Sequence, residues 1–85
     1  MKATEKILGE MAGIPVMLKG KVTVSGRSRT GRAYYSLQRR RDGRNDVRYV
    51  PAGKVELVRG LVRNYNRFMR LVERYVRAAE RNSKF

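Results

Sequence analysis

The longest apolar periodicity in the chain runs through residues 52–82, AGKVELVRGLVRNYNRFMRLVERYVRAAERN. Its apolar residues are separated alternately by three and four positions, the spacing of a and d positions in a heptad repeat. They are Val55, Val58, Val62, Tyr65, Met69, Val72, Val76 and Ala79. Pro51 stands just before the stretch, where its missing N–H costs nothing. The pattern predicts one amphipathic helix, about 45 Å long at about 1.5 Å per residue.

A helix of this length carries more apolar surface than the rest of an 85-residue chain is expected to cover. Small domains without disulfides or metals commonly bury more surface by oligomerising. We therefore expect a homodimer through this helix, held by Val62, Tyr65, Met69, Val72 and Val76. The heptad pattern leaves open whether the two helices run parallel or antiparallel.

Charge is the strongest compositional signal. The chain has 21 Lys and Arg against 7 Asp and Glu, a net charge of +14. Most of the basic residues are Arg, whose planar guanidinium forks onto phosphates and stacks on bases. A small Arg-rich chain of this kind is typical of nucleic-acid-binding proteins. The alternative is a basic surface that is merely solvated, or that meets acidic proteins.

The composition argues against an enzyme and against a metalloprotein. There is no Cys and no His, so thiolate ligands, imidazole ligands and the commonest general base are all missing. The seven acidic residues are scattered rather than clustered. We expect no catalytic residues, no metal and no cofactor.

No apolar run approaches the roughly 20 residues needed to span a membrane, and no secretory signal is visible. We therefore expect no membrane partner and a cytoplasmic, nucleoid-associated location.

The first half of the chain contains the rest of the predicted elements. Residues 1–13 are predicted to form a short helix that covers the core. Residues 14–24 alternate in polarity, which predicts a strand with a bulge or kink at Gly20. Residues 25–32, SGRSRTGR, have nothing apolar to bury and are predicted to be a mobile basic loop.

Residues 33–50 are predicted to form a β-hairpin around Arg41-Asp42-Gly43, for which two registers are possible. A two-residue Asp-Gly turn pairs Leu37 with Arg48 and mixes apolar and charged residues on one face. A three-residue loop with a G1 bulge at Gly43 pairs Leu37 with Val47, and Tyr35 with Tyr49. The second register gives one clean apolar face, so the hydrophobic pattern favours it.

In that register the other face of the hairpin is polar and is the leading candidate for function. It would carry Tyr34, Ser36, Gln38, Arg40, Arg44 and Arg48. A β-ribbon fits the major groove of DNA, where Arg can bind guanine and Gln can bind adenine. The alternative is a solvated face whose Arg residues prevent edge-to-edge association. Further contacts to phosphates are expected from Lys19, Lys21, Arg27, Arg29, Arg32, Arg63, Arg67 and Arg70.

Two segments also resemble a known family. GRAYYSLQRRRDGRNDVRYVP and VELVRGLVRNYNRFMRLVE are similar to short prokaryotic and viral proteins of unassigned function, which share a YYxL hairpin, an RYVP junction and an NYxRF helix. The matching residues are Gly31, Tyr34, Tyr35, Leu37, Gly43, Arg48, Tyr49, Val50, Pro51, Asn64, Tyr65, Arg67 and Phe68. Many members have a Cys cluster before the hairpin, where this chain has SGRSRTG, so no metal role is carried over. The resemblance implies an architecture but no reaction.

The order of hairpin and helix also looks like the arm-binding domains of tyrosine recombinases, which read DNA with a small sheet; this is a likeness of fold alone.

We expect an α+β protein with a short N-terminal helix, an antiparallel sheet of about three strands and a long C-terminal helix. Residues 1–85 are expected to form a single domain, with helix and sheet in 1–50 and the dimerisation helix in 51–82. The expected function is non-catalytic binding of double-stranded DNA by a dimeric regulator or nucleoid-type factor. An adaptor that binds a protein partner through the helix, and RNA binding, are the alternatives.

Overall fold

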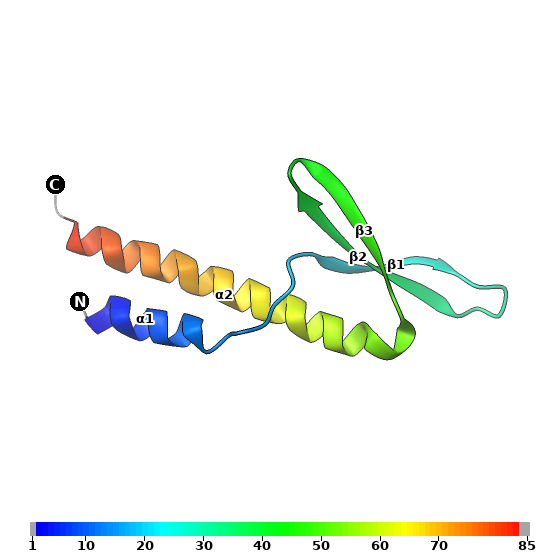
Figure 1. The fold of residues 1–85 in the computed structure, drawn as a ribbon, viewed down its shortest axis with the longest axis horizontal. Helices are drawn as coiled ribbons and strands as arrows, with labels where there is room; N and C mark the ends of the chain where they lie inside the picture. The colour runs from blue at the N-terminus through cyan, green and yellow to red at the C-terminus, as the bar shows by residue number, and fades with distance from the viewer. Residues whose placement is uncertain (1, 84–85) are drawn as a thin grey trace.

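The structure is a computed structural model in which residues 2–83 are described. Helix α1 (Lys2–Ala12) is followed by strands β1 (Lys21–Arg27), β2 (Ala33–Arg41) and β3 (Arg44–Val50). The 3₁₀ turn η1 (Ala52–Lys54) then leads into the 28-residue helix α2 (Val55–Asn82) (Figure 1). The predicted α+β architecture is confirmed, and so is the long C-terminal helix.

The three strands form one antiparallel sheet in the order β1-β2-β3, so β2 is the central strand. The N-terminal part of α2 packs against one face of this sheet. Leu37, Val50 and Val55 are the buried centre of that contact, and Val58 and Val62 pack around them. The first three heptad positions of α2, Val55, Val58 and Val62, therefore belong to the core of a single chain.

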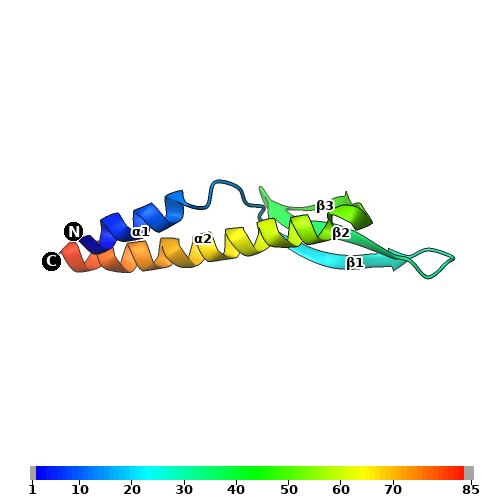
Figure 2. The ribbon, with the colours of Figure 1, turned by 90° about the horizontal axis from the view of Figure 1, so that it is seen from below.

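Helix α1 packs against the other end of α2, as Figure 1 and the turned view in Figure 2 show. Ile7, Ile14 and Leu71 are the buried residues of this second cluster. Phe68 and Tyr75, each one residue before a heptad position (Met69 and Val76), pack around them. The prediction that the N-terminal helix covers part of the core is confirmed. It also means that the chain covers more of α2 than its length suggested.

The strand predicted for residues 14–24 is wrong in its bounds. Residues 14–19 have no strand pairing, and β1 begins only at Lys21. The reason is that the segment hydrogen-bonds to α2 rather than to the sheet: the Leu18 amide donates to the Leu61 carbonyl at 3.0 Å, and the Asn64 side-chain amide donates to the Val16 carbonyl at 3.1 Å. Gly20 then turns the chain into β1 with a φ of 145°.

The favoured register of the hairpin is also wrong. Asp42 and Gly43 have φ angles of 53° and 75°, and they form a two-residue turn of the I′ type, whose twist matches that of the flanking strands. Leu37 is paired with Arg48, and Tyr35 is paired with Val50. The turn geometry decides the register because α2 covers only part of the sheet. Apolar residues of β3 do not all have to lie on the covered face.

Candidate nucleic-acid interface

The observed register divides the side chains of the sheet into two faces. Residues that alternate with buried Leu37 and Val50 point away from α2. We call their surface the outer face. It consists of Lys21 and Thr23 from β1, Tyr34, Ser36, Gln38 and Arg40 from β2, and Asn45, Val47 and Tyr49 from β3.

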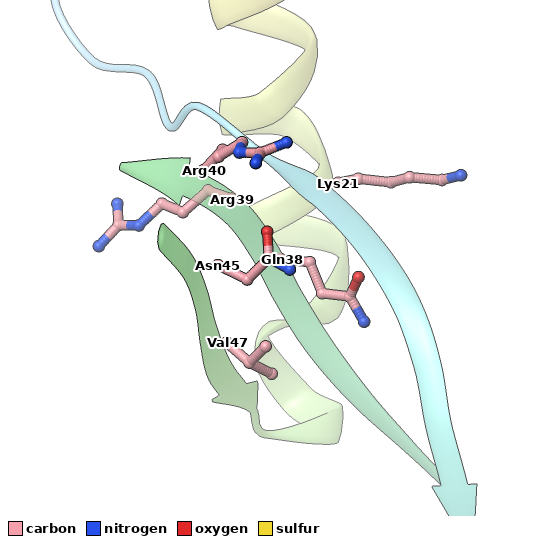
Figure 3. Close-up of a pocket in the computed structure, with 6 residues that line it drawn as sticks. All are labelled: Lys21, Gln38, Arg39, Arg40, Asn45 and Val47. Carbon is pink, nitrogen blue, oxygen red and sulfur yellow. The ribbon is translucent and has the colours of Figure 1, made fainter. Parts of the chain in front are cut away.

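The outer face is organised in rows across the strands. Gln38 lies between Lys21 and Val47, which are its direct partners on β1 and β3. Arg40 lies opposite Asn45 nearer the hairpin turn. These five side chains, with Arg39, line an open depression, and Figure 3 shows them with α2 behind the sheet. Amide, guanidinium, ammonium and apolar groups are thus within one small area.

An aromatic pair lies beside this depression on the same face. The Tyr34 and Tyr49 rings have centroids 6.3 Å apart and are tilted by 57°. Tyr49 is 60% exposed and Val47 59% exposed, although valine is among the residue types most often buried. Sequence reasoning missed Asn45, Val47 and Tyr49 as members of this face. The dipeptide Asp42-Gly43, the strongest sequence signal for a two-residue hairpin, is the signal that could have found them.

The prediction that Arg44 and Arg48 share a face with Gln38 is wrong, because the register places them on the opposite side. Arg48 is paired with Leu37, and Arg44 with Arg41. On this side Arg39 donates from Nε to the Asp46 carboxylate at 2.9 Å.

The basic loop is shorter than predicted, since residues 25–27 belong to β1. The remaining turn is held by hydrogen bonds: the Ser28 amide donates to the Arg32 carbonyl at 2.8 Å, and the Gly31 amide donates to the Ser28 carbonyl at 3.0 Å. Arg27, Arg29 and Arg32 are exposed around it. This turn precedes β2 and the Asp42-Gly43 turn follows it, so the two turns lie at opposite ends of β2, and Figure 1 shows them pointing in different directions.

The three helix arginines do not form one surface with the sheet. Arg63 lines a hollow with Gly20 and Lys21, next to the start of β1. Arg67 and Arg70 instead line a hollow with Glu10 of α1. Lys19 is exposed just before β1. Of the predicted residues, the structure thus brings Lys21, Tyr34, Gln38 and Arg40 onto one face and places the others around the molecule.

Residues 2–83 contain no group of three or more acidic, Cys or His side chains able to hold a metal ion. In the same part of the chain, neither helix is apolar enough over a sufficient length to cross a membrane. The family models, curated proteins and solved structures that were compared with the chain give no match.

Proposed function

We propose that the protein is a non-catalytic nucleic-acid-binding protein that places the outer face of its sheet in the major groove of double-stranded DNA. The observation that carries this proposal is the outer face itself, where Gln38, Asn45 and Arg40 are exposed next to one another and their side chains form no hydrogen bond or ion pair with other residues in the described range 2–83. Their amide and guanidinium groups are the ones that bind adenine and guanine edges. A net charge of +14 supplies the attraction to phosphates.

The dimensions of the sheet support a duplex partner. Neighbouring strands lie about 4.8 Å apart, so the axes of β1 and β3 are about 10 Å apart. The major groove of B-form DNA is about 12 Å wide and admits a two-stranded β-ribbon, such as the β2–β3 hairpin that carries Gln38, Arg40 and Asn45. The major groove of an RNA duplex is deep and narrow, so side chains on a sheet cannot read it. The outer face therefore suits DNA better than double-stranded RNA.

The distribution of charge also supports placing the outer face in the major groove. Eleven of the 21 Lys and Arg lie in residues 19–54, which contain the whole sheet. Lys21 and Arg40 stand at the border of the depression, and Arg27, Arg29 and Arg32 surround the β1–β2 turn. A groove-bound sheet would have phosphates on both sides, within reach of these long side chains.

The test is a gel-shift titration of the purified protein against duplex DNA, single-stranded DNA and duplex RNA at several salt concentrations. We expect duplex DNA to bind most tightly, with an affinity that falls as salt rises. Tighter binding to single strands would favour stacking on Tyr34 and Tyr49 instead of groove reading. A lack of salt-dependent binding to any of the three at about 0.1 M salt would refute the proposal.

We further propose that two chains associate through what we call the α2 stripe, which consists of Tyr65, Met69, Val72 and Val76. Neither cluster of the core includes these residues, and Met69 and Val76 are 40% and 48% exposed. They continue the heptad row by which α2 holds the sheet, and such a row commonly packs on a second helix. Val62, expected in this interface, instead packs against the sheet.

An antiparallel arrangement suits the position of the sheet. The sheet packs on the heptad row of α2 just before the stripe begins, so a parallel partner would bring its own basic sheet to the same end of the helix pair. The two sheets would then compete for space and repel each other. An antiparallel partner places the two outer faces at opposite ends.

The same stripe is the observation that favours the alternative function, an adaptor that binds another protein through α2. A partner helix with its own apolar seam would bury the stripe equally well. The gel-shift titration and the mass of the protein in solution separate the two functions, since an adaptor need neither bind nucleic acid nor self-associate.

A further inference from the structure

The centre of the outer face is neutral, although the chain is strongly basic. Gln38, Asn45, Val47 and Tyr49 are neighbours across β2 and β3, and none of them is charged. Lys21 and Arg40 stand at the edges of this group. The arginines of β3, Arg44 and Arg48, which would suit guanine, point to the other side of the sheet.

An exposed aliphatic side chain lies in the middle of this group. Val47 is directly opposite Gln38, on the next position along the face from Tyr49. Valine has a high strand propensity, which by itself would account for its presence. Its place beside two side-chain amides, however, matches the chemistry of one base pair. Adenine presents a donor and an acceptor to Gln or Asn in the major groove, and its partner thymine presents a 5-methyl group to an apolar side chain.

We propose that the outer face selects A·T base pairs, with Gln38 and Asn45 bound to adenine edges and Val47 packed against the thymine methyl. This inference rests on the proposed function, since it names the base pairs that the same face prefers. Side chains on one face recur about every 6.8 Å along a strand, close to two base-pair steps of about 3.4 Å. The rows from Arg40 to Tyr34 therefore span about six base pairs.

The experiment uses short duplexes with identical flanks and a central block of about six base pairs, the length that the face spans. The block is A·T, G·C, A·U or inosine·C. Uracil lacks only the 5-methyl group of thymine. Inosine·C keeps the major-groove edges of G·C but has a minor groove like that of A·T, so it separates major-groove reading from a preference for minor-groove shape.

We expect A·T to bind more tightly than G·C by roughly 5- to 100-fold, the range for good base contacts. Replacing thymine by uracil should weaken binding about 4-fold per methyl contacted, which corresponds to about 0.8 kcal/mol of apolar burial. Inosine·C should bind like G·C. Equal affinity for A·T and A·U, or for A·T and G·C, would overturn the inference while leaving DNA binding intact. Failure to bind any duplex would overturn both proposals.

A matched pair of variants tests whether Val47 contacts the thymine methyl group. Val47→Ala should reduce the difference between thymine and uracil, because the two γ-methyl groups of Val47 that pack on the thymine methyl are removed. Val24→Ala is the control: Val24 is 53% exposed but is paired with Tyr35 on the face turned towards α2. It should keep the full difference. The same loss in both variants, or in neither, would show that Val47 does not read the methyl group. The duplex series needs no variant, so it decides the inference even if Val47→Ala is poorly folded.

Discussion

Gln38 lies directly opposite Val47 across the β2–β3 hairpin, and this pairing places both side chains on the face turned away from α2. It follows from the two-residue turn at Asp42-Gly43. Had the hairpin adopted the register with one clean apolar face, Val47 would have been opposite Leu37, and Arg48, opposite Ser36, would have shared a face with Gln38. The composition of the outer face is therefore set by a turn at its end.

The turn gives the first prediction. Gly43 has a φ of 75°, so Gly43→Val should lower the free energy of unfolding by about 1–3 kcal/mol, because a β-branched residue is strained there. Gly53→Ala is the control, since Gly53 lies in η1 without a positive φ and with open space around it. Chemical denaturation measures both. Equal stability of the two variants would mean that the turn is not left-handed in solution.

The second prediction concerns the start of β1. A Cβ on Gly20 would come within 2.8 Å of the Gln38 carbonyl oxygen and 2.7 Å of Leu37 Cδ1. Gly20→Ala should therefore destabilise the protein by about 1–3 kcal/mol. Gly26→Ala, with open space around it, should change stability little. If Gly20→Ala left the thermal stability unchanged, Gly20 would not lie as close to Leu37 and Gln38 of β2 in solution as it does in the structure.

The third prediction tests the contact between the two helices. Leu71 is 5% exposed against Ile7, so Leu71→Ala should cost about 2–5 kcal/mol. Leu57→Ala removes the same atoms from a side chain on α2 that is 60% exposed, and it should cost well under 1 kcal/mol. Similar losses for the two variants in urea denaturation would show that α1 does not dock on α2.

The fourth prediction concerns assembly. Val72→Glu should convert the expected dimer to a monomer in sedimentation, because a charge buried between two helices is unfavourable. Leu57→Glu, outside the α2 stripe, should leave the mass unchanged. A wild-type protein that already sediments as a monomer would disprove the dimer.

The relative orientation of the two α2 helices in the dimer can be tested by adding a single Cys, since the natural chain has none. Ala79→Cys lies at a d position near the end of α2, and d positions meet their own copies only in a parallel pair. We expect no disulfide-linked dimer on mild oxidation. Efficient cross-linking at this position would show that the helices run parallel.

The long helix and the existence of the hairpin were predictable because each has a local cause. The heptad row of α2 and the Asp42-Gly43 turn are visible in the sequence without knowledge of what packs on them. The unpaired course of residues 14–19 was not predictable, because its hydrogen bonds reach Leu61 and Asn64 across the fold. The alternating polarity of residues 14–19 has the pattern of a strand whether or not these residues pair in a sheet.

The sequence predicts only part of the candidate interface. Lys21, Tyr34, Gln38 and Arg40 are predicted to contact nucleic acid, and the structure brings them onto one face. The predicted contribution of β3, Arg44 and Arg48, is wrong because not every apolar residue of the hairpin is buried: Val47 and Tyr49 are exposed. Because a single helix covers only part of one face of the sheet, leaving a Val or Tyr exposed costs little free energy. The geometry of the turn therefore decides the register of the hairpin.

We propose that the outer face, and not basic charge in general, binds DNA. Arg40→Ala and Arg48→Ala remove the same charge from exposed residues on opposite faces of the sheet. Fluorescence anisotropy with a preferred duplex at several salt concentrations measures the affinity of each. We predict that Arg40→Ala weakens binding by about 1–3 kcal/mol and that Arg48→Ala changes it by much less. Equal losses for the two variants would contradict the claim and leave only non-specific attraction between a basic protein and DNA.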